Sequence, residues 1–328
     1  SQLAIKYGLS VKRFTLRPYL WPIEELSLLS MLPCCDAMNG ESTKNKSCLL
    51  GAPLAPAGGV TIIGIDLCRP LSPQVKEEIQ RAFRHHHVVI FPGQELSREQ
   101  QYAFIANFGE VEQHGRRTGE TKRYAVAHVI SNLDQDGKPV DRSSSPVSNY
   151  RWHTDKPYYR APPMLTALYA VELPPSGGDT EFANTAMGYA ALPEETKRRI
   201  AALRVVFYWG AGGREAERGL RPETAPREPS WVDHPLVRTH PETGRKALYL
   251  GNHASYILGM PKPEGRALLD GLLAHTTRPE FVYVHCWRKG DLVIWDNRCL
   301  LHRAVANYDM GRYRRVLHRS VVRGTVPF

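Results

Sequence analysis

The stretch that decides the fold reads DLVIWDNRCLLHR and spans residues 291–303. Its segment 292–295 is an uninterrupted apolar run of strand length, which predicts a buried β-strand. The Asp296-Asn297 pair that follows is typical of a turn. His302 comes just past this strand and turn, so we expect its imidazole to point back into the mouth of a barrel. A histidine packed in the core or at its rim fits the position equally well.

Similar short runs recur along the chain and are separated by Gly/Pro turns. Helical spacing appears at 72–87, 97–108 and 261–275, with Ser97 as the N-cap of the second helix. Many short strands with a few helices predict a mainly β fold with flanking helices, arranged as a double-sheet jelly roll. The expected strands are 60–65, 88–91, 124–130, 165–171, 203–208, 246–250, 281–287, 292–295 and 316–322.

The first 57 residues differ from the rest, because Pro, Ser, Lys and Cys are scattered there without a clean period. We predict an N-terminal extension of unknown role over 1–57 and one main domain over 58–328. Two long polar segments, 131–149 and 210–235, interrupt the main domain. Loops of this length in a compact domain are functional lids or disordered inserts.

The composition of the 328 residues narrows the partners and the compartment. Lys and Arg exceed Asp and Glu by 43 − 33 = +10, which invites a nucleic-acid or membrane interpretation. The most apolar early stretch, 16–32, contains Pro18, Pro22, Glu24 and Glu25. These interruptions argue against a membrane span or a secretory signal, whereas a short organelle leader within 1–30 remains compatible. Six cysteines without CxxC spacing favour a reduced, cytoplasmic protein with no membrane partner.

The segment Trp152-His153-Thr154-Asp155 carries the clearest chemistry. In a strand, residues two apart point to one face, so His153 and Asp155 would lie together. An imidazole and a carboxylate supply two ligands of a 2-His-1-carboxylate triad, which leaves positions open on Fe(II). We take His302 as the best candidate for the third ligand. A hydrogen-bonded surface His–Asp pair is the alternative for this motif alone.

Four motifs in this order resemble the taurine dioxygenase superfamily: WHTD at 152–155, GGDT at 177–180, WDN at 295–297 with His302, and the arginines 314, 315 and 319. The resemblance runs from about residue 58 to the C-terminus. It implies a double-stranded β-helix and an Fe(II)- and 2-oxoglutarate-dependent dioxygenase over 58–328. Such an enzyme would hydroxylate its substrate with O₂ and release succinate and CO₂. The implied iron ligands are His153, Asp155 and His302.

The resemblance also implies residues for the co-substrate. Thr180, 27 residues after His153, matches a threonine that contacts a 2-oxoglutarate carboxylate. Arg315 matches the arginine that binds the far carboxylate, and a guanidinium suits this role because it offers a bidentate fork. Asn149 matches an asparagine that lines the region of co-substrate and substrate. Without the motifs, Thr180 would be a turn residue and Arg315 a surface charge.

Arg319 carries the prediction for the substrate. Positions 315 and 319 share one face of the last strand, so both arginines should point inward. Two buried arginines need two anions, of which 2-oxoglutarate supplies one and the substrate the other. The six arginines between 302 and 328 would therefore serve small anions rather than nucleic acid. The run of histidines at 85–87 is predicted to be a solvated or C-terminal cap feature, not a metal site.

Several stretches look closer to the 2,4-dichlorophenoxyacetate dioxygenase branch than to taurine dioxygenase; these are 130–132 with 136–138, 178–182, 253–255 and 297–303. This branch implies an aryloxyalkanoate or related carboxylate, a role in aromatic acid catabolism and, for an ether substrate, cleavage to a phenol. His114 points the other way, since it matches a taurine dioxygenase histidine that binds the sulfonate. An exposed loop histidine is its alternative, so carboxylate and sulfonate both stay open.

The same residues also allow other functional interpretations. A taurine or alkylsulfonate dioxygenase would use the same residues. A hydrolytic zinc enzyme could use the same ligands, but it leaves Thr180 and Arg315 unexplained. A non-catalytic metal-binding jelly roll would bind a ligand without turnover, and a nucleic-acid-binding module fits the charge least well. Members of the superfamily are often homo-oligomers, and we expect the same here.

Overall fold

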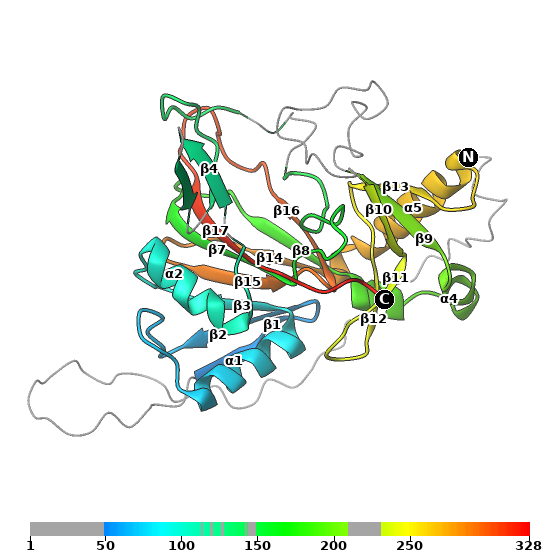
Figure 1. Cartoon of the computed structure of the whole chain (residues 1–328), viewed down its shortest axis with the longest axis horizontal. Coiled ribbons are helices and arrows are strands. Elements are labelled where there is room, and N and C mark those ends of the chain that lie inside the picture. The colour runs from blue at the N-terminus through cyan, green and yellow to red at the C-terminus, as the bar shows by residue number, and fades with distance from the viewer. Residues whose placement is uncertain are drawn as a thin grey trace, which may run out of the picture. The chain divides into compact units, whose positions relative to one another are not determined.

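The computed structural model describes residues 49–112, 114–118, 121–125, 128–141, 143, 149–208 and 231–328. Within this part the fold is mainly β with helices on the outside, as expected (Figure 1). No helix among the described residues is both long and apolar enough to cross a membrane.

The larger sheet has seven strands and runs through the centre of the fold. Its strands are antiparallel except for one parallel pair, β2 and β3. In spatial order they are β1 (Leu49–Ala55), β2 (Gly58–Ile63), β3 (Val88–Phe91), β15 (Leu292–Asp296), β7 (Leu165–Glu172), β17 (Val316–Val322) and β6 (His128–Ser131). The apolar stretch of DLVIWDNRCLLHR is thus a central strand of this sheet.

A smaller antiparallel sheet packs against one face of the larger one. Its order is β14 (Val282–His285), β8 (Thr180–Asn184) and β16 (Leu300–Ala304). Alternation along β15 explains the layers, because Val293 and Trp295 face the smaller sheet while Leu292 and Ile294 face away. Phe182 of β8 packs in the same cluster as Trp295. The space between the two sheets is therefore a shared apolar core.

The outer face of the larger sheet is covered by two early helices, α1 (Pro73–His86) and α2 (Arg98–Ile105), and the latter continues as η2 (Ala106–Phe108) (Figure 1). Ile79 and Phe83 of α1 and Phe104 of α2 are buried against it. Ser97 caps α2 as predicted: its hydroxyl accepts from the Gln100 backbone, and the Gln100 side chain accepts from the Ser97 backbone.

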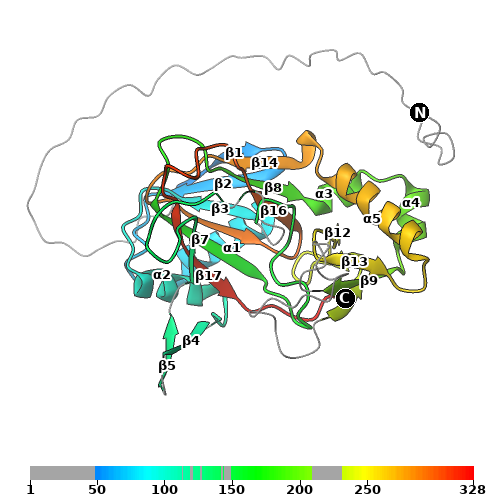
Figure 2. The ribbon, with the colours of Figure 1, turned by 90° about the horizontal axis from the view of Figure 1, so that it is seen from above.

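A third cluster of elements lies at the other end of the sheets (Figure 2). It comprises a sheet of β10 (Trp231–Pro235), β9 (Arg204–Tyr208) and β13 (Ala254–Ile257), the pair β11 (Val237–Thr239) and β12 (Lys246–Leu248), the helices α3 (Thr185–Ala190), α4 (Glu194–Ile200) and α5 (Lys262–Thr276), and η3 (Pro279–Phe281). A separate hairpin pairs β4 (His114–Thr118) with β5 (Thr121–Ala125).

The structure differs from the sequence prediction in several places. Residues 49–55 form β1 and pair with β2, so the sheet begins inside the stretch assigned to the N-terminal extension. The strand expected at 124–130 is two strands, β5 and β6. Most of the extension, 1–48, and most of the second polar segment, 209–230, lie outside the described residues. The possible role of these segments as an extension or lid thus stays a prediction.

Candidate metal centre

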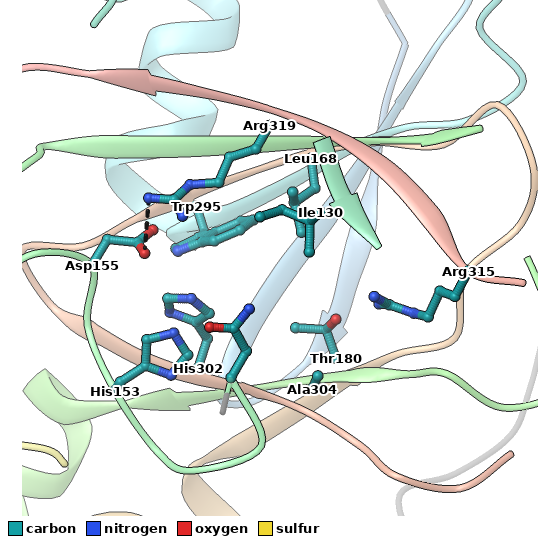
Figure 3. Close-up of a pocket in the computed structure, with 11 residues that line it drawn as sticks. Ile130, His153, Asp155, Leu168, Thr180, Trp295, His302, Ala304, Arg315 and Arg319 are labelled. Carbon is teal, nitrogen blue, oxygen red and sulfur yellow. Dashed lines mark ion pairs between the residues drawn. The ribbon is translucent and has the colours of Figure 1, made fainter. Parts of the chain in front are cut away.

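Two histidines that are 149 positions apart form a direct backbone pair. The His153 amide donates to the His302 carbonyl at 3.0 Å, and the His302 amide donates to the His153 carbonyl at 2.8 Å. Their ring centroids lie 4.1 Å apart. Asp155 completes the group, and one ligand atom from each of the three residues lies within 4.8 Å of the others. The structure thus brings the three predicted ligands together (Figure 3).

The local structure around these ligands differs from the prediction in two ways. His153 and Asp155 do not lie in a strand; His153 makes an isolated bridge, and the chain turns at Lys156, which has a left-handed φ of 46°. His302 follows β15 and its turn, as predicted, but it lies within a further strand, β16, that was not predicted. Asp155 still faces the two rings, because the segment is held by the Thr154 hydroxyl, which donates to the Asn297 carbonyl at 3.0 Å.

Burial sets the charge of the three side chains. It lowers the pKa of His153 and lowers that of His302 further, because an imidazolium is disfavoured away from water. Burial alone would raise the pKa of Asp155, but the Arg319 guanidinium and the hydrogen bond from Thr166 hold this pKa well below its usual range. Two neutral imidazoles and one carboxylate are the protonation states that a divalent metal requires.

Arg319 lies beside the candidate ligands. Its Nη2 is 3.2 Å from Oδ1 of Asp155, and its Nε is buried without a hydrogen-bond partner among the described residues. We expected both arginines to require a ligand anion, and this expectation was wrong for Arg319, because Asp155 supplies a carboxylate. The unused Nε still points to a further acceptor in the same pocket.

Arg315 lies at the opposite end of this pocket, next to Thr180 (Figure 3). Its side chain is buried, its Nε donates to the Gly178 carbonyl at 2.9 Å, and its Nη2 has no partner among the described residues. Asn132 fixes the backbone, since its Oδ1 accepts from the Arg315 amide at 2.8 Å. A buried guanidinium with a free N–H is a ready site for an anion.

The glycine pair before β8 makes this arrangement possible. Gly177 and Gly178 have φ angles of +74° and +72°, which other residues rarely adopt. A Cβ on Gly178 would meet the Cδ and Nε of Arg315 at 3.1 Å. The motif therefore allows the backbone to approach Arg315 closely and places Thr180 at the start of β8.

The hydroxyl of Thr180 has a defined direction. The indole N–H of Trp287 donates to Thr180 Oγ1 at 2.9 Å. Because this nitrogen can only donate, Thr180 must accept, and its own proton is left for an acceptor in the pocket. Asn149 lines the same pocket. His114 is the first residue of β4, and its side chain lies outside the described part of the structure.

Sequence reasoning missed three residues that orient the predicted ones. Asn132 and Trp287 hold Arg315 and Thr180, and Thr166 donates to Oδ2 of Asp155. Asn132 lies in a stretch that already resembled the aryloxy branch, and this could have drawn attention to it. No local pattern marks Thr166 or Trp287, because their partners are far away along the chain.

A second group of possible ligands, His87, Asp296 and Cys299, lies elsewhere in the core. Its carboxylate is already engaged: Arg298 donates to both oxygens of Asp296 at 2.8 Å, and Nε2 of His240 lies 2.9 Å from Oδ2. Burial also raises the pKa of the Cys299 thiol well above its usual range, so this side chain does not supply the thiolate that binds a metal. The first group is therefore the better metal site.

Comparisons with known proteins agree with this geometry. Residues 50–321 match the family model described as taurine catabolism dioxygenase TauD, TfdA family. The chain belongs to this family. It is therefore a dioxygenase, and its dependence on Fe(II), 2-oxoglutarate and O₂ agrees with the sequence prediction.

Three relatives show the range of the family around this chain. An alpha-ketoglutarate-dependent 2,4-dichlorophenoxyacetate dioxygenase of Cupriavidus pinatubonensis is 39% identical over 283 residues, covering 82% of this chain and 95% of its own. An alpha-ketoglutarate-dependent sulfate ester dioxygenase of Pseudomonas putida is 33% identical over 289 residues, covering 84% and 89%. The crystal structure of AAD-2 in complex with Mn(II) and N-oxalylglycine is 35% identical and superposes with a TM-score of 0.74, covering 86% and 98%.

Proposed function

We propose that this dioxygenase hydroxylates an anionic small molecule of the aryloxyalkanoate class. In this proposal His153, Asp155 and His302 hold Fe(II), while Thr180, Arg315 and Asn149 bind 2-oxoglutarate. Arg319 binds the substrate carboxylate. The observation that supports the proposal is one pocket with the three candidate metal ligands at one end and the buried Arg315 at the other.

The residues present fit the metal. The Nδ1 of His302 is buried without a hydrogen-bond partner among the described residues, and both imidazoles are held neutral. Nitrogen and carboxylate donors of this kind suit Fe(II). When bound, Fe(II) with 2-oxoglutarate and O₂ supplies the oxidant that hydroxylates a C–H bond, with succinate and CO₂ as co-products.

The residues also fit a dicarboxylate co-substrate. The free Nη2 of Arg315 and the hydroxyl proton of Thr180 face the same end of the pocket. A ligand with a carboxylate there and oxygen donors at its other end would extend toward the candidate metal ligands. The protein's task is to fix this orientation, because charge-assisted hydrogen bonds are both strong and directional.

The rest of the pocket supports an aryloxy acid as substrate. Arg319 offers its free Nε beside Asp155, and Ile130, Leu168 and Trp295 contribute apolar lining. An aryl ring against this lining and a carboxylate on Arg319 would hold the carbon between them near the metal. Hydroxylation of a carbon that bears an ether oxygen gives a hemiacetal, which collapses to a phenol and an oxo-acid.

Product analysis tests the proposal. The Fe(II)-loaded protein would be incubated with 2-oxoglutarate, O₂ and a panel of aryloxyacetates, aryloxypropionates, alkylsulfonates and sulfate esters. We expect equal amounts of succinate and phenol from an aryloxyacetate. If no member of the panel increases the formation of succinate, the proposal is wrong.

A sulfonate or sulfate ester is the second candidate substrate, because the Pseudomonas putida relative is named for that activity. The residue predicted to bind a sulfonate, His114, begins the β4–β5 hairpin. Sulfite or sulfate released in place of phenol would favour this candidate.

Three broader statements complete the proposal. The two sheets that share one core would form a double-stranded β-helix, supported by the apolar cluster between them. The protein would work in the cytoplasm, which agrees with free thiols at the described cysteines Cys68, Cys286 and Cys299. It would be a homo-oligomer that does not bind nucleic acid, and light scattering with a DNA-retention assay tests both points.

A further inference from the structure

The carboxylate of Asp155 is held on both sides by different groups. The hydroxyl of Thr166 donates to its Oδ2 at 2.5 Å, and Arg319 approaches its Oδ1. Thr166 lies on β7, where it is fully buried. Its neighbour on the adjacent strand β15 is Trp295, through the register that pairs these two residues. The position of Thr166 under Asp155 is therefore fixed by the central sheet.

A chain of hydrogen bonds sets the direction of the Thr166 proton. The indole N–H of Trp295 donates to Asn297 Oδ1 at 3.0 Å, and Asn297 Nδ2 donates to Thr166 Oγ1 at 2.9 Å. An indole nitrogen can only donate, so the Asn297 amide has one orientation. Thr166 then accepts from Asn297 and must direct its own proton to Asp155. All three residues are almost completely buried, so water does not compete.

We propose that Thr166 is a positioning residue for the metal ligand Asp155, and that Trp295 and Asn297 act through it. The hydroxyl occupies Oδ2 and fixes the plane of the carboxylate, so a metal ion would bind at Oδ1, through the lone pair that the Arg319 contact does not use. Asp155 would then bind through one oxygen and keep a coordination position open. This inference rests on the proposed function, because it requires that Asp155 is a ligand.

Metal affinity measures this role without turnover. Mn(II) would be titrated into the full chain, and the free Mn(II) signal would be followed by electron paramagnetic resonance. Thr166→Val removes the hydroxyl and preserves the shape, and we expect the dissociation constant to rise about 10- to 100-fold, as is usual for partners of metal ligands. Thr166→Ser restores the hydroxyl and should bind nearly as the natural protein does.

Thr185→Val is a matched control. Thr185 is also buried, and its hydroxyl donates to a backbone carbonyl, that of Cys299, at 2.9 Å. Its hydroxyl and its amide both bond to the Cys299 carbonyl and not to a candidate ligand, so its replacement should leave Mn(II) affinity unchanged. Thermal melting of each variant separates a loss of affinity from a loss of fold.

Trp295→Phe tests whether the chain acts through Thr166. Losing the indole N–H frees the Asn297 amide to rotate, so this variant should bind Mn(II) more weakly than the natural protein. Phenylalanine keeps an aromatic ring beside His302, whose ring centroid lies 4.7 Å from that of Trp295. In a Thr166→Val background the same change should therefore have little further effect, because the hydrogen-bond chain to Asp155 is already interrupted. Independent, additive effects would contradict the inference, and so would Thr166→Val with natural affinity.

Failure of the proposed metal site and failure of the hydrogen-bond chain through Thr166 give different results. If the natural protein does not bind Mn(II), the metal site of the proposed function is wrong. If it binds Mn(II) and Thr166→Val binds it equally well, the metal site stands and only the relay is wrong. If Thr166→Val does not fold, the Trp295→Phe and Thr166→Ser variants decide: natural affinity in Trp295→Phe, or weak binding in a folded Thr166→Ser, overturns the relay.

Discussion

Arg319 touches a candidate metal ligand and also has an unused donor. Its Nη2 contacts Asp155, whereas its Nε has no partner among the described residues. The side chain is 17% exposed, so a substrate can reach it. One guanidinium can therefore contact the candidate metal ligand and, in the proposed function, a substrate anion at the same time.

Replacing Arg319 should weaken substrate binding and spare the metal. A hydrogen bond to a charged group contributes about 1.5–3 kcal/mol, so Arg319→Ala should raise KM for an aryloxyacetate roughly 10- to 100-fold. Mn(II) affinity should not fall, because a cation beside Asp155 is removed. Arg323→Ala is the control, since Arg323 is an exposed arginine paired with Glu110. An unchanged KM in Arg319→Ala defeats the substrate assignment.

Trp287 should act on the co-substrate through Thr180. Trp287→Phe keeps an aromatic ring in the core but removes the N–H that orients the Thr180 hydroxyl. A neutral hydrogen bond contributes about 0.5–1.5 kcal/mol, so KM for 2-oxoglutarate should rise roughly 2- to 10-fold. Steady-state kinetics at saturating aryloxy acid measure this. A change in the KM of the aryloxy acid alone would show that Trp287 has another role.

At the scale of elements, the turn before β8 lies at the end of the pocket that is proposed to bind the co-substrate. Gly178 faces Arg315, whose backbone amide is fixed by Asn132. The turn before β8 and Asn132, which follows β6, therefore hold Arg315 from two directions. A change in the shape of the turn should weaken co-substrate binding more than it weakens metal binding.

Gly178→Ala tests this link. The added Cβ would meet Arg315 at 3.1 Å, and the φ of +72° adds backbone strain of about 1 kcal/mol. We expect KM for 2-oxoglutarate to rise more than about tenfold while Mn(II) affinity stays the same. Gly244→Ala is the matched control, because Gly244 has a φ of +67° and open space around it. Equal kinetics in the two variants would contradict the role of the turn.

The junction between α1 and β3 should make the fold sensitive to acid. His87 ends α1 with a left-handed φ of 62°, and its side chain is buried, so the predicted cap is confirmed but not the solvated ring. Burial lowers the pKa of His87 to about 4. The unfolded chain therefore binds a proton near pH 6.5 that the folded chain excludes. The contribution of His87 to the free energy of unfolding is therefore present in full above pH 6.5 and decreases as the pH falls toward 4.

Urea unfolding at two pH values measures this effect. When the pH is lowered from 7.5 to 5.5, His87 alone should reduce the free energy of unfolding by about 1.3 kcal/mol. His87→Asn tolerates the left-handed φ and lacks the titrating ring, so its loss over this interval should be smaller by about that amount. An identical pH dependence in the natural protein and the variant would show that His87 does not contribute.

At the scale of the whole molecule, the sequence predicted what short-range patterns encode. Continuous apolar runs located β3 and β15, and helical spacing with Ser97 located α2. The motifs named the side chains that the structure brings together at 153, 155 and 302. Strand β16 was missed because it follows the turn after β15 closely and pairs with β8, which lies far back in the sequence.

Long-range hydrogen bonds account for most of what could not be predicted. Thr166 and Trp287 look like ordinary core residues in the sequence, and their roles exist only after the sheets have formed. The Arg319–Asp155 pair was missed for the same reason, since charge counts do not show which carboxylate lies nearby. Motifs predicted the ligands of the site, whereas the tertiary fold supplies the residues that orient them.

The most direct test of the central claim is an anaerobic titration with Fe(II) and 2-oxoglutarate, followed by visible absorption. The natural protein should develop a weak metal-to-ligand charge-transfer band that saturates at one Fe(II) per chain. His302→Ala should fold but give no band, and Arg315→Met should require far more 2-oxoglutarate to reach it. A natural protein without the band, or a His302→Ala variant with the full band, would contradict the metal centre at His153, Asp155 and His302.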